Sequence, residues 1–97
     1  MARPRPLDDE QLDEALAALI GWDVVEGKLH KVFTFGDFGC AFGFMASAAV
    51  FAEKIDHHPE WSNVYATVTV DLITHDAGGI TELDVRFAQR LDELAGH

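Results

Sequence analysis

The sequence contains one cysteine, and this scarcity excludes two kinds of structural site. Because Cys40 is the only thiol, no disulfide can form within the chain and no metal site can be built on several thiolates. Cys40 lies in FGCAFGF, among aromatic and small residues, with no basic neighbour that would activate it. We therefore predict that Cys40 is a small buried apolar residue.

Basic residues are also scarce: 7 lysines and arginines stand against 17 aspartates and glutamates, a net charge of −10. Nucleic acids and anionic membranes bind through basic side chains that neutralise phosphates. A surface of this charge repels both, so we expect no direct nucleic-acid partner and no membrane partner. Acidity itself favours solubility and names no partner.

Long apolar runs are missing as well. No stretch approaches the roughly 20 apolar residues of a membrane span, and the N-terminal MARPRPLDDE lacks the apolar segment of a signal peptide. We therefore expect a cytoplasmic protein. With 97 residues, 48% of them apolar, the chain is predicted to be one domain, 1–97, whose residues 1–7 form a mobile N-terminal arm.

Capping residues and apolar spacing predict three helices. Asp8 caps the first, with Gln11 in the capping-box position and Gly21 as the stop. Asp37 caps a long central helix that Pro59 ends. Thr81 caps the last helix, 80–96, with an apolar stripe at Leu83, Phe87, Leu91 and Leu94.

Two apolar rows run along the central helix. We therefore expect this helix to be buried on more than one side, against its own sheet and a partner subunit. The rows are Phe38, Phe42, Met45, Ala49 and Ala52, and Phe44, Ala48, Phe51 and Ile55.

Strand signals lie between the helices. WDVVEG and KLHKVFTF are predicted to be two short strands with Gly27 in the turn. VYATVTVDLIT, 64–74, is the clearest strand, and a short further strand is predicted near Trp61. Helices beside an antiparallel sheet indicate an α+β domain.

Two adjacent histidines, His57 and His58, stand at the predicted end of the central helix. Side chains of adjacent helical residues point about 100° apart, but Pro59 takes His58 out of helical geometry, so that both rings can face one cavity. The negative end of the helix dipole favours protonated imidazole there, which suits proton-transfer chemistry. A purely structural interpretation remains open. In it, the two histidines are the solvated end of the helix, and Glu53 is only a neighbour of His57 on the helix surface.

A third histidine, His75, comes at the end of the clearest strand. Whether it reaches His57 within one chain or through a partner subunit depends on topology. Alternatively, it is only a turn residue, and Asp84 only completes the capping box begun by Thr81. Histidine pairs in catalytic zinc sites lie four apart on a helix or two apart on a strand; neither spacing occurs, so we expect no metal.

These residues together resemble the pterin-4a-carbinolamine dehydratase family. The matching pattern is Glu53-x3-His57-His58-Pro59, then Trp61, His75 in THDAGG and Asp84 in ITELD. The resemblance runs from about residue 12 to residue 94, including FTFGDFGCAFGFM. One departure is Lys31, where many members carry arginine.

The resemblance implies a fold and an activity. The fold is a four-stranded antiparallel sheet with three helices on one face, in the order α-β-β-α-β-β-α. The activity is dehydration of 4a-hydroxytetrahydropterin to quinonoid dihydropterin, which recycles the cofactor of aromatic amino-acid hydroxylases. It implies a homodimer or tetramer, and no metal or bound cofactor.

The resemblance also assigns residues. His57, His58 and His75 map onto the active-site histidines, and Glu53 and Asp84 onto the supporting acids. Within this scheme we expect His57 to be the base, His75 the acid, and His58 to orient the pterin, although these roles can be exchanged. Trp61 is either an apolar wall of the pterin site or a core residue, and Tyr65 is expected to pack. The alternative function is a pterin-binding or dimerisation-cofactor protein that acts through partner contacts without turnover.

Overall fold

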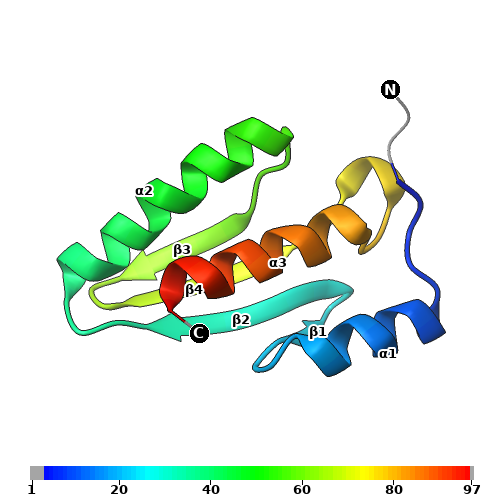
Figure 1. Ribbon diagram of the computed structural model, residues 1–97, viewed down its shortest axis with the longest axis horizontal. Helices are drawn as coiled ribbons and strands as arrows, with labels where there is room; N and C mark the ends of the chain where they lie inside the picture. The colour runs from blue at the N-terminus through cyan, green and yellow to red at the C-terminus, as the bar shows by residue number, and fades with distance from the viewer. Residues whose placement is uncertain (1–3, 97) are drawn as a thin grey trace.

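A computed structural model describes residues 4–96 and shows an α+β domain (Figure 1). The element order is the expected α-β-β-α-β-β-α, with one added 3-10 turn, η1. The elements are α1 (Asp9–Ala18), β1 (Asp23–Val25), β2 (Lys28–Thr34), α2 (Phe38–Ile55), β3 (Glu60–Val64), β4 (Thr67–Leu72), η1 (His75–Ala77) and α3 (Glu82–Ala95).

The four strands form one antiparallel sheet in the order β1-β2-β4-β3. Glu26 and Gly27 join β1 to β2 with φ angles of 52° and 78°, the left-handed pair that a two-residue hairpin turn requires. Gly27 is therefore the turn residue that the sequence predicted. In the centre of the sheet, His30 pairs with Asp71, and Asp71 pairs with Glu60 on its other side.

The core lies between one face of the sheet and the helices. Side chains alternate across β2 and β4, and the inward ones are Leu29, Phe33, Val68, Val70 and Leu72. The α2 and α3 helices lie side by side over this face (Figure 1), and α1 adds Leu12 and Leu16 to the same core.

The N-terminal segment lies against the loop before α3. The Leu7 N–H donates to the Ile80 carbonyl at 2.8 Å, and Pro6 lies beside Gly79. Residues 1–3 of the predicted mobile arm and residue 97 lie outside the described residues. Mobility of the arm stays a prediction.

The segment that the sequence suggested as one strand, 64–74, is divided. Val64 ends β3 and is 75% exposed, while Tyr65 and Ala66 form the turn into β4. Tyr65 has a φ of 50°, and the Asn63 side chain donates to its carbonyl at 3.1 Å. The expectation that Tyr65 packs is therefore wrong: its side chain projects from a tight turn and is 67% exposed.

The central helix begins where the sequence predicted and ends earlier. The Asp37 side chain accepts from the Cys40 N–H at 2.7 Å and caps α2. The helix stops at Ile55 because Asp56 is left-handed, with φ 51° and ψ 48°, and its N–H closes on the carbonyls of Ala52 and Glu53. Pro59 therefore stands four residues beyond the helix end and does not terminate it.

Cys40 is exposed, so its predicted burial is wrong. It lies in the first turn of α2 on the side away from the core, whereas Ala41 and Phe44 point inward. The hydrogen bond with Asp37 raises the pKa of the Cys40 thiol. A raised pKa disfavours the thiolate, which is the reactive form.

Only one of the two apolar rows of α2 is covered within the chain. In the row of Phe44, Ala48, Phe51 and Ile55 every side chain is buried or half-buried. In the other row Ala52 is buried, but Phe38 and Phe42 are about half exposed. By length and composition α2 resembles a membrane span, with a mean hydropathy of 1.4 over 18 residues. One such helix is weak evidence, because the core helix of a soluble domain has the same character.

Lys31 is a buried cation that joins β2 to the end of α3. Its Nζ donates to the Ile20 carbonyl at 3.1 Å and to Asp92 at 2.8 Å, and it lies 4.9 Å from the centre of the Phe33 ring. The Trp22 indole N–H also donates to Asp92, at 3.1 Å. Burial of a charge is tolerated when it is paired and hydrogen-bonded in this way.

Phe33 tests the core. Its ring is 1% exposed and lies 4.9 Å from the ring of Phe44 and 5.8 Å from that of Trp22. We expect Phe33→Ala to lower the free energy of unfolding in urea by about 3–5 kcal/mol, the cost of a large cavity. The control Ile20→Ala removes an 84% exposed side chain and should cost under about 0.5 kcal/mol. Equal losses in the two variants would contradict this description of the core.

Candidate active site

The three histidines singled out in the sequence lie around one cavity. The cavity has a volume of about 200 Å³ and is lined by Asp56, His57, His58, Ile73, Thr74, His75 and Asp76. His57 and His58 follow the end of α2, and His75 opens η1 beyond β4. A single chain therefore brings them together, which answers the topological question that the sequence left open.

The left-handed cap at Asp56 explains how adjacent histidines can face one space. After this residue the chain leaves the helix axis, and the His57 N–H still closes on the Ala52 carbonyl at 3.1 Å. The His57 side chain turns inward and is 7% exposed, whereas His58 remains exposed. The predicted escape from helical geometry occurs, but Asp56 produces it rather than Pro59.

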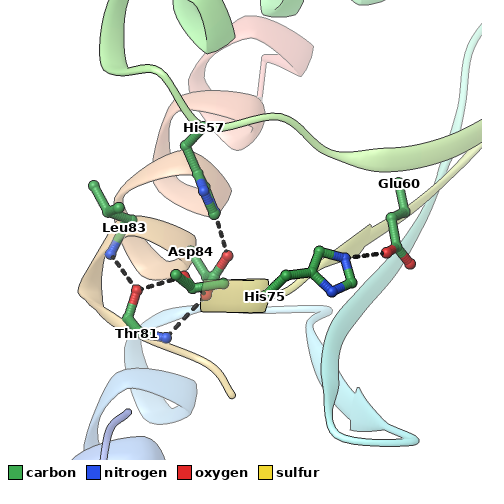
Figure 2. A network of polar contacts seen from close by, with 7 residues as sticks. His57, Glu60, His75, Thr81, Leu83 and Asp84 are labelled. Atoms are coloured by element: carbon green, nitrogen blue, oxygen red, sulfur yellow. Dashed lines mark hydrogen bonds and ion pairs between the residues drawn. The ribbon is translucent and has the colours of Figure 1, made fainter. Parts of the chain in front are cut away.

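His57 is held by a buried carboxylate. Its Nε2 lies 2.5 Å from Oδ1 of Asp84, which is fully buried in the first turn of α3 (Figure 2). The other oxygen, Oδ2, accepts from the Thr81 N–H at 2.9 Å and from the Thr74 hydroxyl at 2.8 Å. Asp84 therefore completes the capping box and also binds a histidine, so the two readings of this residue hold together.

The hydrogen-bond directions around Asp84 follow from its role as an acceptor. Because the Thr74 hydroxyl donates to Asp84, it must accept from the Thr81 hydroxyl, which lies 2.7 Å away. The Thr81 oxygen in turn accepts from the Leu83 N–H at 3.2 Å. Each proton has a defined acceptor, and within residues 4–96 no buried side-chain nitrogen or oxygen lacks a partner.

Glu53, which the sequence left as a neighbour of either adjacent histidine, pairs with His58. Nε2 of His58 lies 2.8 Å from Oε1 of Glu53, one helical turn back on α2. Both side chains are more than half exposed, so water screens this pair and it contributes little to stability. Glu53 is thus a neighbour of His58 and not of His57.

His75 has a partner that sequence reasoning missed. Its Nε2 lies 2.7 Å from Oε2 of Glu60, the first residue of β3 (Figure 2). The other oxygen of Glu60 accepts from Lys28 Nζ at 2.5 Å. This hydrogen bond with Lys28, followed by the one with His75, lowers the pKa of Glu60 below its ordinary value.

Two further residues, Glu60 and Thr74, therefore belong to the site. Glu60 follows the HHP motif directly, but its role depends on the register that puts it beside the end of β4. Thr74 precedes His75 and is 2% exposed. Its place in THDAGG, directly before a candidate histidine, was the sequence signal available for it.

The histidines share one geometry. Each presents Nε2 to a carboxylate: His57 to Asp84, His58 to Glu53 and His75 to Glu60. A carboxylate only accepts hydrogen bonds, so each Nε2 carries a proton and donates it. Nδ1 is then the nitrogen through which each ring can take up a proton from a ligand or give one to it.

Trp61 lies away from the cavity lining. It pairs with Val70 on the inward face of the sheet and packs, half-buried, against the core. Of its two open readings, the core role agrees with this position. Among residues 4–96, no group of three or more histidine, cysteine, aspartate or glutamate side chains is arranged to hold a metal ion.

Comparison with known families gives the decisive observation. The sequence profile described as "Pterin 4 alpha carbinolamine dehydratase" matches residues 5–94. The chain belongs to this family. It is 57% identical over 93 residues to a protein of Dinoroseobacter shibae, covering 92% of this chain and 96% of the relative, and that protein is named "Putative pterin-4-alpha-carbinolamine dehydratase".

Other relatives of the same family agree. A Brucella ovis protein with the same name is 51% identical over 98 residues, covering 99% of this chain and all of the relative. The crystal structure of a Brucella melitensis "transcriptional coactivator/pterin dehydratase" has a TM-score of 0.92 at 49% identity, covering 95% of this chain and 100% of that one. A "pterin dehydratase-like protein", described as a RuBisCO assembly factor in the alpha-carboxysome, has a TM-score of 0.64 at 28% identity, covering 77% and 87%.

Asp84 tests the buried hydrogen-bond network. In Asp84→Asn one acceptor oxygen is replaced by an N–H₂ group, which must face a donor from His57, Thr74 or Thr81. The amide either leaves a buried donor unsatisfied or forces His57 into the other tautomer, and it removes the charge that these donors stabilise, so we expect the free energy of unfolding in urea to fall by about 1–3 kcal/mol.

The matched control for Asp84→Asn is Glu53→Gln, which changes the exposed carboxylate beside His58 in the same way. It should cost less than about 1 kcal/mol, as exposed ion pairs do. If the two variants unfold at the same urea concentration, Asp84 does not have the structural role described here.

Proposed function

We propose that this protein is a hydro-lyase that converts 4a-hydroxytetrahydropterin to quinonoid dihydropterin and water. Membership of the family supports the pterin substrate and the reaction type. The observation that carries the proposal is the convergence of His57, His58 and His75 on one cavity, each with Nδ1 left to exchange a proton.

The reaction needs one base and one acid. The bond between C4a and its hydroxyl oxygen breaks as that oxygen receives a proton, and N5 loses its proton as the N5–C4a double bond forms. In our proposal Nδ1 of His57 takes the N5 proton, and Nδ1 of His75 supplies the proton to the departing water. The two protons balance, since one histidine gains what the other loses.

The surroundings of each ring support these roles. The buried Asp84 carboxylate beside His57 stabilises the positive charge that a base acquires, as the aspartate of a catalytic triad does. His75 is 71% exposed in its side chain, so it can regain a proton from solvent after each turnover. His58, at the rim, would orient the pterin.

The cavity size bears on how a pterin would bind. A volume of about 200 Å³ is below the roughly 300–1,000 Å³ of typical small-molecule sites. A pterin would therefore place its reacting edge among the histidines and leave its side chain at the open rim. We infer that the reaction needs no metal or bound cofactor, because imidazole supplies both acid and base.

We further propose a cytoplasmic homodimer or tetramer linked functionally to an aromatic amino-acid hydroxylase. The half-exposed side chains of Phe38 and Phe42 on α2 support the oligomer. Their rings lie 5.7 Å apart and form an apolar surface that a second subunit could cover. A second candidate function has the same support: a pterin-binding or dimerisation-cofactor protein that contacts a partner through this surface without turnover. Two relatives are described as a coactivator and as an assembly factor.

A stopped-flow absorbance assay tests the reaction. Chemically generated 4a-hydroxytetrahydropterin is mixed with the protein in the presence of a chelator, and quinonoid formation is followed. We expect rapid dehydration by the wild type and a loss of roughly 10²–10⁴-fold in His57→Ala and in His75→Ala, the usual contribution of a general acid or base.

The matched control for the kinetic assay is His30→Ala. His30 bonds Asp71 at 2.9 Å on the sheet and does not line the cavity, so its removal should leave the rate unchanged. No acceleration by folded wild-type protein would reject the enzyme and favour the partner-binding alternative. Loss of activity on adding the chelator would reject metal independence alone.

A further inference from the structure

The contact between Glu60 and His75 joins a strand of the sheet to a short turn outside it. His75 is the first residue of the short turn η1, and its side chain is largely exposed. Glu60 lies on β3, where it pairs with Asp71 of β4 in the sheet. An exposed imidazole on a turn has several rotamers of similar energy, so a fixed partner on the sheet selects one of them.

Lys28 holds Glu60 from the opposite side. It comes from β2, which is separated from β3 by β4, so its side chain crosses the strand that leads to Thr74 and His75. Lys28 and His75 occupy different oxygens of Glu60, at 2.5 Å and 2.7 Å. The carboxylate therefore has one orientation, with one oxygen committed to each donor.

Stability does not account for this arrangement. The side chains of Lys28 and Glu60 are 31% and 42% exposed, and ion pairs at such positions contribute little to folding. The lowered pKa of Glu60, caused first by Lys28 and then by His75, keeps the carboxylate ionised in mildly acidic solution. The acceptor for His75 therefore stays ionised to a lower pH than an unpaired glutamate would.

We propose that Glu60, held by Lys28, is a positioning residue for His75: it keeps a proton on Nε2, so that Nδ1 faces the cavity both in the imidazolium, which gives its Nδ1 proton, and in the neutral Nε2–H tautomer that remains. The catalytic part of this inference rests on the proposed function, because it assumes that His75 transfers a proton to substrate. The tautomer part does not. Glu60 itself need not touch the pterin.

The variant Glu60→Gln separates these parts. Its side chain has one acceptor oxygen for two donors, and the permanently charged Lys28 competes for it. The amide N–H₂ then faces Nε2 of His75 and favours the opposite tautomer, with the proton on Nδ1. We expect the ¹⁵N chemical shifts of the His75 ring to report this change of tautomer at a pH where the ring is neutral.

Kinetics provide the second measurement. We expect kcat of Glu60→Gln to fall roughly 10- to 100-fold, by analogy with the loss of a carboxylate that orients a metal-bound histidine, with little change in KM. In the double variant Lys28→Met/Glu60→Gln the amide oxygen is free for His75, so the wild-type tautomer and most of kcat should return. A merely structural role for Glu60 predicts no such rescue.

The control is Asp71→Asn, which alters another carboxylate paired with a histidine on the same face of the sheet. It should leave both the His75 shifts and kcat unchanged. Unaltered His75 shifts in Glu60→Gln, or altered shifts with kcat at the level of Asp71→Asn, would overturn the inference. A tautomer change in a protein whose wild type shows no dehydration would support the positioning and reject the proposed function instead.

Discussion

The burial of the Asp84 carboxylate is the constraint on which the site depends. A buried charge is tolerated only where hydrogen bonds replace its lost hydration, and three groups of the protein supply them: His57, the Thr74 hydroxyl and the Thr81 N–H. These groups come from the end of α2, the end of β4 and the start of α3. One buried residue therefore fixes three chain segments that are far apart in the sequence.

The same residue links folding to chemistry. As the capping-box partner of Thr81, Asp84 stabilises the first turn of α3, and as the acceptor for His57 it orients a candidate base. The α3 helix also buries Phe87, whose ring lies 6.4 Å from that of His57. Position and burial of His57 are consequences of how α3 begins, so the site cannot shift independently of the core.

Much of this arrangement could be predicted from sequence, because the signals were local. The caps Asp8, Asp37 and Thr81 act within one helical turn, and all three occur as expected. The histidines were found by their motif. The left-handed residues Asp56 and Tyr65 were not predicted, since neither is glycine and their φ angles follow from the tertiary path of the chain.

The role of Glu60 in the site could not be predicted from the sequence for the same reason. Its contacts with His75 and Lys28 span 15 and 32 residues of sequence, and they require the register of β3 on β4 and the crossing of Lys28 above it. Helical spacing could suggest Glu53, which lies four residues before His57, although its partner in the structure is His58. No comparable short-range rule relates positions 28, 60 and 75, so only the folded sheet reveals them.

The carboxylates that bind His57 and His75 differ in burial and in their neighbouring charges. Asp84 is buried and makes no contact with a cation among those described, so its charge acts on His57 at close range in a poorly screened environment. Glu60 shares its charge with Lys28, and solvent screens it. His57 therefore faces a buried carboxylate, whereas the carboxylate beside His75 is shared with a cation and exposed to solvent. The dehydration that we propose needs a base at N5 and an acid at the C4a hydroxyl, and the two histidines assigned to these roles differ in the charge that surrounds them.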